Sequence, residues 1–168
     1  MIYYISGGER SGKSTFAQNL ALKLSNNPCY LATARVLDKE MEERVIKHKN
    51  DRDDNWNLIE ESYYLSKVDF KNKTVVIDCV TLWLTNIFFD NNEDLELSLK
   101  IAKNEINNIK IKNSNIIFVS NEIGMGLHGQ TTTTRKFVQL QGWINQFIAN
   151  KADIAYFMIS GIPLKIKG

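Results

Sequence analysis

Short apolar runs alternate along the chain with longer segments in which apolar residues recur at helical spacing. The apolar runs predict β-strands at residues 2–6, 29–34, 74–78, 116–120 and 154–160, with a short edge strand at 164–167. The longer segments predict helices at residues 13–24, 38–50, 95–112 and 135–149, the last of them capped by Thr134. Because continuous apolar strands that alternate with helices are typical of parallel sheets, we expect an α/β fold. Residues 1–168 would form one domain around a doubly wound, mainly parallel sheet.

The composition is that of an ordinary compact domain and narrows the possible partners. Of the 168 residues, 43% are hydrophobic and 24% are charged, and the formal net charge is only +2. This balance argues against a nucleic-acid coat or an anionic-membrane binder. Cys29 and Cys79 lie in or beside apolar runs, where buried free thiols suit a reducing cytoplasm. No apolar segment approaches the roughly 18 residues of a membrane span, and the first residues do not resemble an export signal. We therefore expect a cytoplasmic protein without membrane insertion.

Residues 7–14, Gly-Gly-Glu-Arg-Ser-Gly-Lys-Ser, match the phosphate-loop pattern G-x-x-x-x-G-K-[ST] between the first predicted strand and the first predicted helix. Backbone N–H groups of such a loop wrap phosphates, and Lys13 reaches the β and γ oxygens. Ser14 can hold Mg²⁺, with Asp78 at the end of a buried strand as its natural partner. Asp78 is also suited to cap a helix. The loop predicts a protein that binds a nucleoside triphosphate.

A second cluster of candidate residues lies between residues 44 and 60. On a helix, Arg44, His48 and Arg52 would share one face. The two cations would keep the imidazole neutral and nucleophilic and would hold a phosphate brought to it, although a solvated basic face has the same spacing. Glu60 can accept two hydrogen bonds from the N1–H and N2–H₂ groups of guanine, a donor pair that adenine lacks, or it can simply be exposed.

Six motifs cover essentially the whole chain: GGERSGKS at 7–14, YLATA at 30–34, R-x3-H-x3-R-x3-W-x3-E at 44–60, DCVTLWLTN at 78–86, SNEIGMG at 120–126 and GIPLKIK at 161–167. In this order they resemble the bifunctional adenosylcobinamide kinase and adenosylcobinamide-phosphate guanylyltransferase family of cobalamin biosynthesis. The resemblance is specific, because the histidine block and the Asn-Glu-Ile-Gly block are not general properties of phosphate-loop proteins. Gln139, where an acidic residue is common, and the loop 127–134, which contains His128, depart from the family pattern.

The resemblance implies an enzyme with two steps. ATP or GTP first phosphorylates the aminopropanol hydroxyl of adenosylcobinamide. His48 then attacks the α-phosphorus of GTP, releases pyrophosphate and carries GMP to adenosylcobinamide phosphate, which becomes adenosylcobinamide-GDP. The family further implies a RecA-like strand order and a homotrimer. Glu122, at the end of a strand, would either orient or deprotonate the accepting hydroxyl or order the loop that follows.

Residue by residue, the resemblance places His48 as the catalytic nucleophile and Ser14 and Asp78 as the residues that meet Mg²⁺. Contacts with the nucleotide fall on Gly7, Gly8, Glu9, Arg10, Ser11, Gly12, Lys13, Ser14, Ala32, Thr33, Ala34, Lys49, Asn50, Asp51, Arg52, Glu60 and Asp78. The expected partners are thus Mg²⁺, GTP, ATP, adenosylcobinamide and its phosphate, with no nucleic acid.

Two other classes of protein share the phosphate loop. An ordinary small-molecule kinase would not need His48 and would not become covalently attached to a nucleotide. A nucleotide-gated binding protein or a RecA-like DNA partner would show partner-dependent hydrolysis or salt-sensitive DNA affinity. The near-zero net charge makes the DNA partner the least attractive of these.

Overall fold

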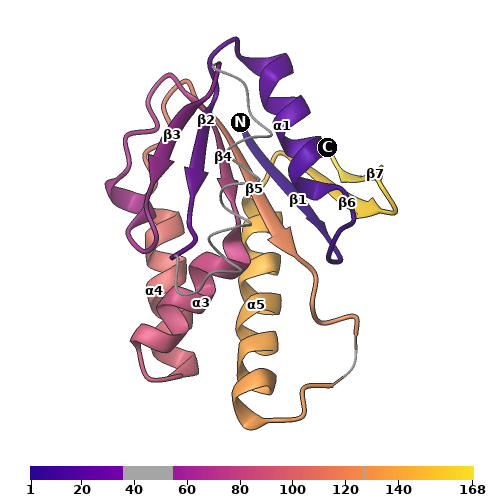
Figure 1. Ribbon diagram of the computed structural model, residues 1–168. Helices are drawn as coiled ribbons and strands as arrows, with labels where there is room; N and C mark the ends of the chain where they lie inside the picture. The colour runs from indigo at the N-terminus through magenta and orange to yellow at the C-terminus, as the bar shows by residue number, and fades with distance from the viewer. Residues whose placement is uncertain (36–54, 127) are drawn as a thin grey trace.

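The computed structural model describes residues 1–35, 55–126 and 128–168. Its elements form one β-sheet with helices on both faces (Figure 1). In chain order they are β1 (Ile2–Gly7), α1 (Lys13–Leu24), β2 (Cys29–Ala32), β3 (Asn57–Glu60), the 3-10 helix η1 (Leu65–Lys67), β4 (Thr74–Asp78), α3 (Val80–Asp90), α4 (Leu95–Asn107), β5 (Asn115–Asn121), α5 (Thr132–Lys151), β6 (Ile154–Ile159) and β7 (Ile162–Lys167).

Within residues 1–35, 55–126 and 128–168, seven strands form the sheet, in the order β3-β2-β4-β5-β1-β6-β7. Every pair is parallel except β6 with β7, which is antiparallel at one edge. The strand that leads into the glycine loop, β1, lies between β5 and β6 in the interior of the sheet. This order confirms the predicted α/β fold with a mainly parallel, RecA-like sheet.

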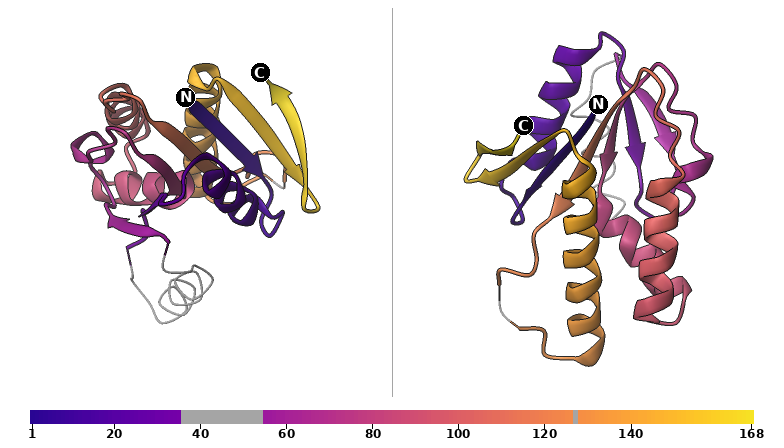
Figure 2. Two further views of the ribbon diagram at one scale, coloured as in Figure 1. Left: turned by 90° about the horizontal axis from the view of Figure 1, so that it is seen from above. Right: turned by 180° about the vertical axis from the view of Figure 1, so that it is seen from behind.

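Side chains of the interior strands alternate between two apolar layers, as the pleat of a strand requires. In β4, Val76 packs in the layer below α1, whereas Val75 and Ile77 pack in the layer below α3, α4 and α5. Figure 2, seen from above, shows α1 on one side of the sheet and α4 and α5 on the other. Ala17 and Ala21 of α1 are fully buried, and such small side chains let the helix lie close to the strands. The predicted double winding is confirmed.

Several predicted boundaries were wrong. β2 ends at Ala32 instead of residue 34, because Thr33 turns its hydroxyl to Cys79. α4 ends at Asn107 instead of residue 112. The cap of α5 is Thr131, whose side chain accepts from the backbone N–H of Thr134, so Thr134 lies within the helix.

Two further elements differ from their sequence predictions. β3 was not predicted, because its four residues are mostly exposed and carry no clear apolar alternation. β7 is the predicted edge strand but begins at Ile162.

The helix predicted at 38–50 lies outside the described residues. Both cysteines are buried free thiols, as expected. Within the described part of the chain, no helix is both long enough and apolar enough to span a bilayer.

Candidate nucleotide-binding site

The carboxyl ends of the parallel strands place several candidate residues side by side. Glu60 of β3 pairs with Ala32 of β2, and Ala32 pairs with Asp78 of β4. Partners in a parallel ladder point to the same face, and Asp78 follows the alternation of Val76, so this row lies on the α1 side of the sheet. Ligands of open parallel sheets bind at this edge. The fold therefore gathers residues from three separate motifs beside the start of α1.

The glycine loop joins β1 to α1 through a backbone that only small residues tolerate at two points. Gly12 has φ +88°, and a Cβ there would lie 3.2 Å from the Cα of Gly161. A Cβ on Gly7 would lie 2.6 Å from the carbonyl oxygen of Met158, in the neighbouring strand β6. The N–H of Gly161 donates to the carbonyl of Ser11 at 3.0 Å and ties the loop to the turn after β6. This backbone leaves room close to the loop's own N–H groups.

Lys13 is the first residue of α1 and is only 7% exposed. Its ammonium donates to the carbonyl of Gly8 and to the hydroxyl of Ser11, the latter at 3.4 Å. Burial lowers the pKa of Lys13, and the attraction of Cys79, Asp78 and Glu9 offsets part of that effect. A buried ammonium held over the loop is suited to an anionic ligand. Burial costs the ammonium its hydration by water, and charge-assisted hydrogen bonds to a phosphate would compensate for that loss. Ser14 follows at the second position of the helix.

Asp78 ends β4 with a carboxylate oxygen, Oδ2, that is buried and has no hydrogen-bond partner among the described residues. A buried carboxylate oxygen without a donor requires an explanation, and a cation ligand is one that fits. Asp78 is not the cap of the next helix, because that position belongs to Cys79. A cis peptide bond joins Asp78 to Cys79. The sulfur of Cys79 accepts from the N–H of Leu82 at 3.5 Å. The carboxylate is therefore not used by α3.

Thr33 is fully buried, and its hydroxyl is engaged on both sides. It donates to the carbonyl of Cys79 at 2.8 Å and accepts from the N–H of Cys79 at 2.9 Å. Ala32 and Ala34, on either side, are partly exposed. Asn86 is not among the residues predicted to form the site, yet its amide Nδ2 donates to the carbonyl of Thr33 at 2.9 Å. In the sequence, Asn86 is marked by its place as a polar residue within the apolar run LWLTNIFF and as the last residue of the motif at 78–86.

Glu122 follows β5 and lies beside the glycine loop. Its backbone N–H donates to the carbonyl of Gly7 at 2.9 Å, and its side-chain Oε1 accepts from the N–H of Gly124 at 2.8 Å. This geometry matches a carboxylate that orders its own loop, one of the two roles considered from the sequence. His128 is exposed on the same loop.

The remaining candidates divide between an exposed strand end and the part of the chain that is not described. Glu60 is exposed at the end of β3. His48, Lys49, Asn50, Asp51 and Arg52 lie outside the described residues. Just before that part of the chain, the guanidinium of Arg35 pairs with the carboxylate of Asp90 at 2.7 Å and donates to the hydroxyl of Ser62 at 3.1 Å.

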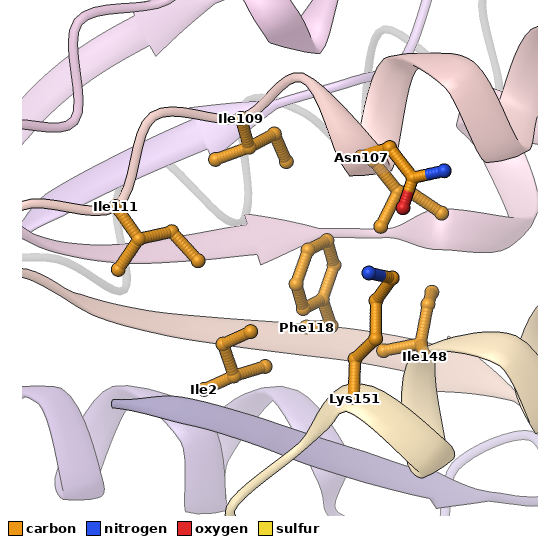
Figure 3. A pocket seen from close by; sticks show the side chains of 8 residues that line it. Ile2, Asn107, Ile109, Ile111, Phe118, Ile148 and Lys151 are labelled. Atoms are coloured by element: carbon orange, nitrogen blue, oxygen red, sulfur yellow. The ribbon is translucent and has the colours of Figure 1, made fainter.

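A cavity of about 200 Å³ lies at the opposite end of the strands. Its lining comes from the start of β1, the ends of α4 and α5 and the segment between α4 and β5, and it is mostly isoleucine (Figure 3). The polar side chains around it are Asn107 and Lys151. Because it lies at the amino ends of the strands, it is separate from the phosphate loop.

The chain is similar to known proteins over nearly its whole length. A family model described as "Cobinamide kinase / cobinamide phosphate guanyltransferase" matches residues 3–166. The "Bifunctional adenosylcobalamin biosynthesis protein CobP" of Pseudomonas aeruginosa is 32% identical over 98% of this chain and 96% of its own. The corresponding CobU protein of Escherichia coli is 32% identical over 99% of this chain and 100% of its own. Among solved structures, the flagellar accessory protein FlaH from Methanocaldococcus jannaschii aligns with a TM-score of 0.48 at 12% identity, covering 99% of this chain and 77% of its own.

Proposed function

The chain belongs to the cobinamide kinase / cobinamide phosphate guanyltransferase family, and from this premise we propose that it acts twice on one corrinoid. It phosphorylates adenosylcobinamide with ATP or GTP. It then transfers GMP from GTP to adenosylcobinamide phosphate through a covalent intermediate on His48. The observation that carries the proposal is the near full-length family match in a chain that keeps both the phosphate loop and the Arg44, His48 and Arg52 spacing.

The first step passes the γ-phosphoryl group from the nucleotide to the aminopropanol hydroxyl of adenosylcobinamide. The loop N–H groups and Lys13 bind the triphosphate and stabilise the negative charge on the transferred group. Mg²⁺, when bound with the nucleotide, would neutralise further charge there, with Ser14 and Asp78 as its protein contacts. The buried Oδ2 of Asp78, which has no hydrogen-bond partner in the part of the chain that the structure describes, supports this role, because Mg²⁺ takes one or two carboxylates together with phosphate oxygens.

The second step uses His48 as the nucleophile. A neutral imidazole nitrogen forms a bond to the α-phosphorus of GTP while the bond from that phosphorus to the bridging oxygen breaks, and pyrophosphate leaves. A phosphate oxygen of adenosylcobinamide phosphate then attacks the same phosphorus. The phosphorus–nitrogen bond breaks, the histidine is regenerated and adenosylcobinamide-GDP is released. The spacing of Arg44 and Arg52 on either side of His48 supports this chemistry, because cations disfavour imidazolium and attract phosphate.

Glu60 recognises the guanine base of GTP in the second step. Its carboxylate can accept from the N1–H and N2–H₂ groups of guanine, and its exposed position in the same row as Asp78 supports a base at one end of the row and phosphates at the other. Residues 49–52 follow His48 and supply further contacts with GTP. The enzyme acts as a homotrimer in the cytoplasm, as one domain over residues 1–168, without nucleic acid or membrane insertion.

The proposal is tested by the order of the products. Purified protein is incubated with adenosylcobinamide, GTP and Mg²⁺, and the products are separated and weighed by mass spectrometry. Adenosylcobinamide phosphate should appear first and adenosylcobinamide-GDP second. Lys13→Met should abolish the first product, whereas Lys23→Met, an exposed lysine in the last turn of the same helix, should not. Formation of the phosphate ester alone would reduce the protein to a simple kinase.

A further inference from the structure

The hydroxyl of Thr33 continues the sheet where strand β2 has ended. The regular pairing of β2 with β4 stops at Ala32 and Asp78, and Thr33 N–H makes a long bond of 3.4 Å to the carbonyl of Asp78. Beyond that point one side-chain oxygen serves both backbone groups of Cys79, at 2.8 and 2.9 Å. Buried backbone groups need partners, so this hydroxyl fixes the peptide plane that follows Asp78.

The amide of Asn86 fixes Thr33 in turn. Asn86 lies on α3, is 8% exposed, and uses Nδ2 to donate to the carbonyls of Thr33 and Ser62, each at 2.9 Å. Both N–H groups of the amide are thereby used, which neither an aspartate nor a leucine could reproduce. Ser62 lies two residues after Glu60. One buried side chain thus joins the segments that follow β2 and β3 to the helix that follows β4.

The position of the Asp78 carboxylate follows from the backbone that carries it, because its Oδ2 accepts no hydrogen bond among the described residues. The carboxylate lies on the α1 face of the sheet, whereas Asn86 belongs to α3 on the other face. The Thr33 hydroxyl is engaged by both backbone groups of Cys79, and the Asn86 amide by two backbone carbonyls, so both groups contact the protein backbone. They act on Asp78 through the backbone that carries it.

We propose that Thr33 and Asn86 form a clamp that positions the Asp78 carboxylate for the magnesium ion of bound nucleotide. Thr33 and Asn86 are positioning residues, and the Thr33 hydroxyl contacts the protein instead of GTP. The inference rests on the proposed function in one respect, that Mg²⁺ accompanies the triphosphate at Asp78. Residues that orient a metal-binding group typically change metal affinity by about 10- to 100-fold when they are replaced.

The test compares the affinity for GTP in Mg²⁺ with the affinity in EDTA, measured by calorimetry. We define the Mg²⁺ ratio as the dissociation constant for GTP in EDTA divided by the dissociation constant in Mg²⁺. This ratio reports what Mg²⁺ adds to binding, and Asp78→Asn shows how much of it depends on the carboxylate. Thr33→Val keeps the shape of the side chain but removes the hydroxyl, and it should lower the ratio by about tenfold. Thr33→Ser should restore the wild-type ratio.

A matched control separates positioning from stability. Thr74 is a buried threonine at the other end of β4, where its hydroxyl accepts from Asn115 at 3.2 Å. Thr74→Val should lower the melting temperature but leave the Mg²⁺ ratio unchanged. If Thr33→Val does not fold, Asn86→Leu replaces it, and it should lower the ratio in the same direction.

The outcomes distinguish the clamp from the proposed function. A wild-type Mg²⁺ ratio in a folded Thr33→Val protein would overturn the clamp and leave the proposed function intact. A wild-type protein whose affinity for GTP ignores Mg²⁺, while it still makes the two corrinoid products, would also overturn the clamp alone. A wild-type protein that neither binds GTP nor forms the products would overturn both.

Discussion

Two glycines of the phosphate loop give a sharp test of its backbone. Gly12 has φ +88°, in the left-handed region, and a Cβ there would lie 3.2 Å from the Cα of Gly161. Gly8 has no such φ, and a Cβ there would meet nothing within 4 Å. Gly12→Ala and Gly8→Ala therefore make the same chemical change four residues apart, and the structure predicts opposite effects on the stability of the protein without nucleotide.

The size of the difference follows from the conformations. A left-handed conformation costs a residue with a Cβ about 1–2 kcal/mol, before the close contact with Gly161 is counted. Replacing a glycine by alanine at a permissive position stabilises by about 0.4–1 kcal/mol, because the unfolded chain loses freedom. The free energies of unfolding of the two variants should therefore differ by about 1.5–3 kcal/mol. For a chain of this size that is a difference of about 3–12 °C in melting temperature.

Thermal and urea denaturation of both variants, without nucleotide, measure this difference. Gly12→Ala should melt below the wild type, and Gly8→Ala should melt at or slightly above it. Nucleotide affinity gives a second comparison, because the methyl group of Gly8→Ala would occupy the open space beside the loop, where phosphates are proposed to bind. Equal melting temperatures for the two variants would refute the backbone conformation assigned to Gly12.

Three further predictions concern single side chains. Burial raises the pKa of the Cys79 thiol from the ordinary 9.0 to about 12. Below pH 9, the thiolate fraction of Cys79, and with it the rate at which iodoacetamide labels Cys79, should be about 1000-fold lower in folded than in unfolded protein. Similar labelling rates would contradict the burial of this thiol. Trp83→Phe removes a 2.8 Å hydrogen bond from the buried indole N–H to the carbonyl of Tyr63, and it should lower the free energy of unfolding in urea by about 1–3 kcal/mol; an unchanged midpoint would argue against that bond. Glu122→Gln can keep the bond from Gly124, so kinase turnover should stay close to wild type, whereas loss of a general base would slow it about 10²- to 10⁴-fold.

The parts of the fold that the sequence predicted are those in which local pattern and burial agree. In the strand at Thr74–Asp78, the three central residues are all apolar because both faces of the sheet are covered there. The strand at Asn57–Glu60 could not be found in this way, because it is short, mostly exposed and held by its pairing with β2. The cap of α5 was placed wrongly because four consecutive threonines offer equivalent hydroxyls, and only tertiary structure selects Thr131.

The candidate site divides along the same line. The glycine loop is continuous in sequence, and its pattern names its residues directly. The contacts made by Thr33 cannot be predicted in this way, because the hydroxyl meets Cys79 46 residues away and the carbonyl meets Asn86 53 residues away. Periodicity carries no information about pairs so distant. The apolar run at 82–89 has the same limit: Trp83, Leu84, Ile87 and Phe88 enter the core, whereas its one buried amide is Asn86.

The most direct test of the two-step account is whether the protein becomes covalently labelled by GTP. Purified protein is incubated with α-labelled GTP and Mg²⁺ and run on a denaturing gel, beside α-labelled ATP and the variants His48→Ala and His128→Ala. The chain has two histidines, and His128→Ala is the matched control. The account predicts an acid-labile label that requires GTP, disappears in His48→Ala and persists in His128→Ala. Folded wild-type protein that binds GTP and forms adenosylcobinamide-GDP but takes no label, or a label that survives in His48→Ala, would contradict it.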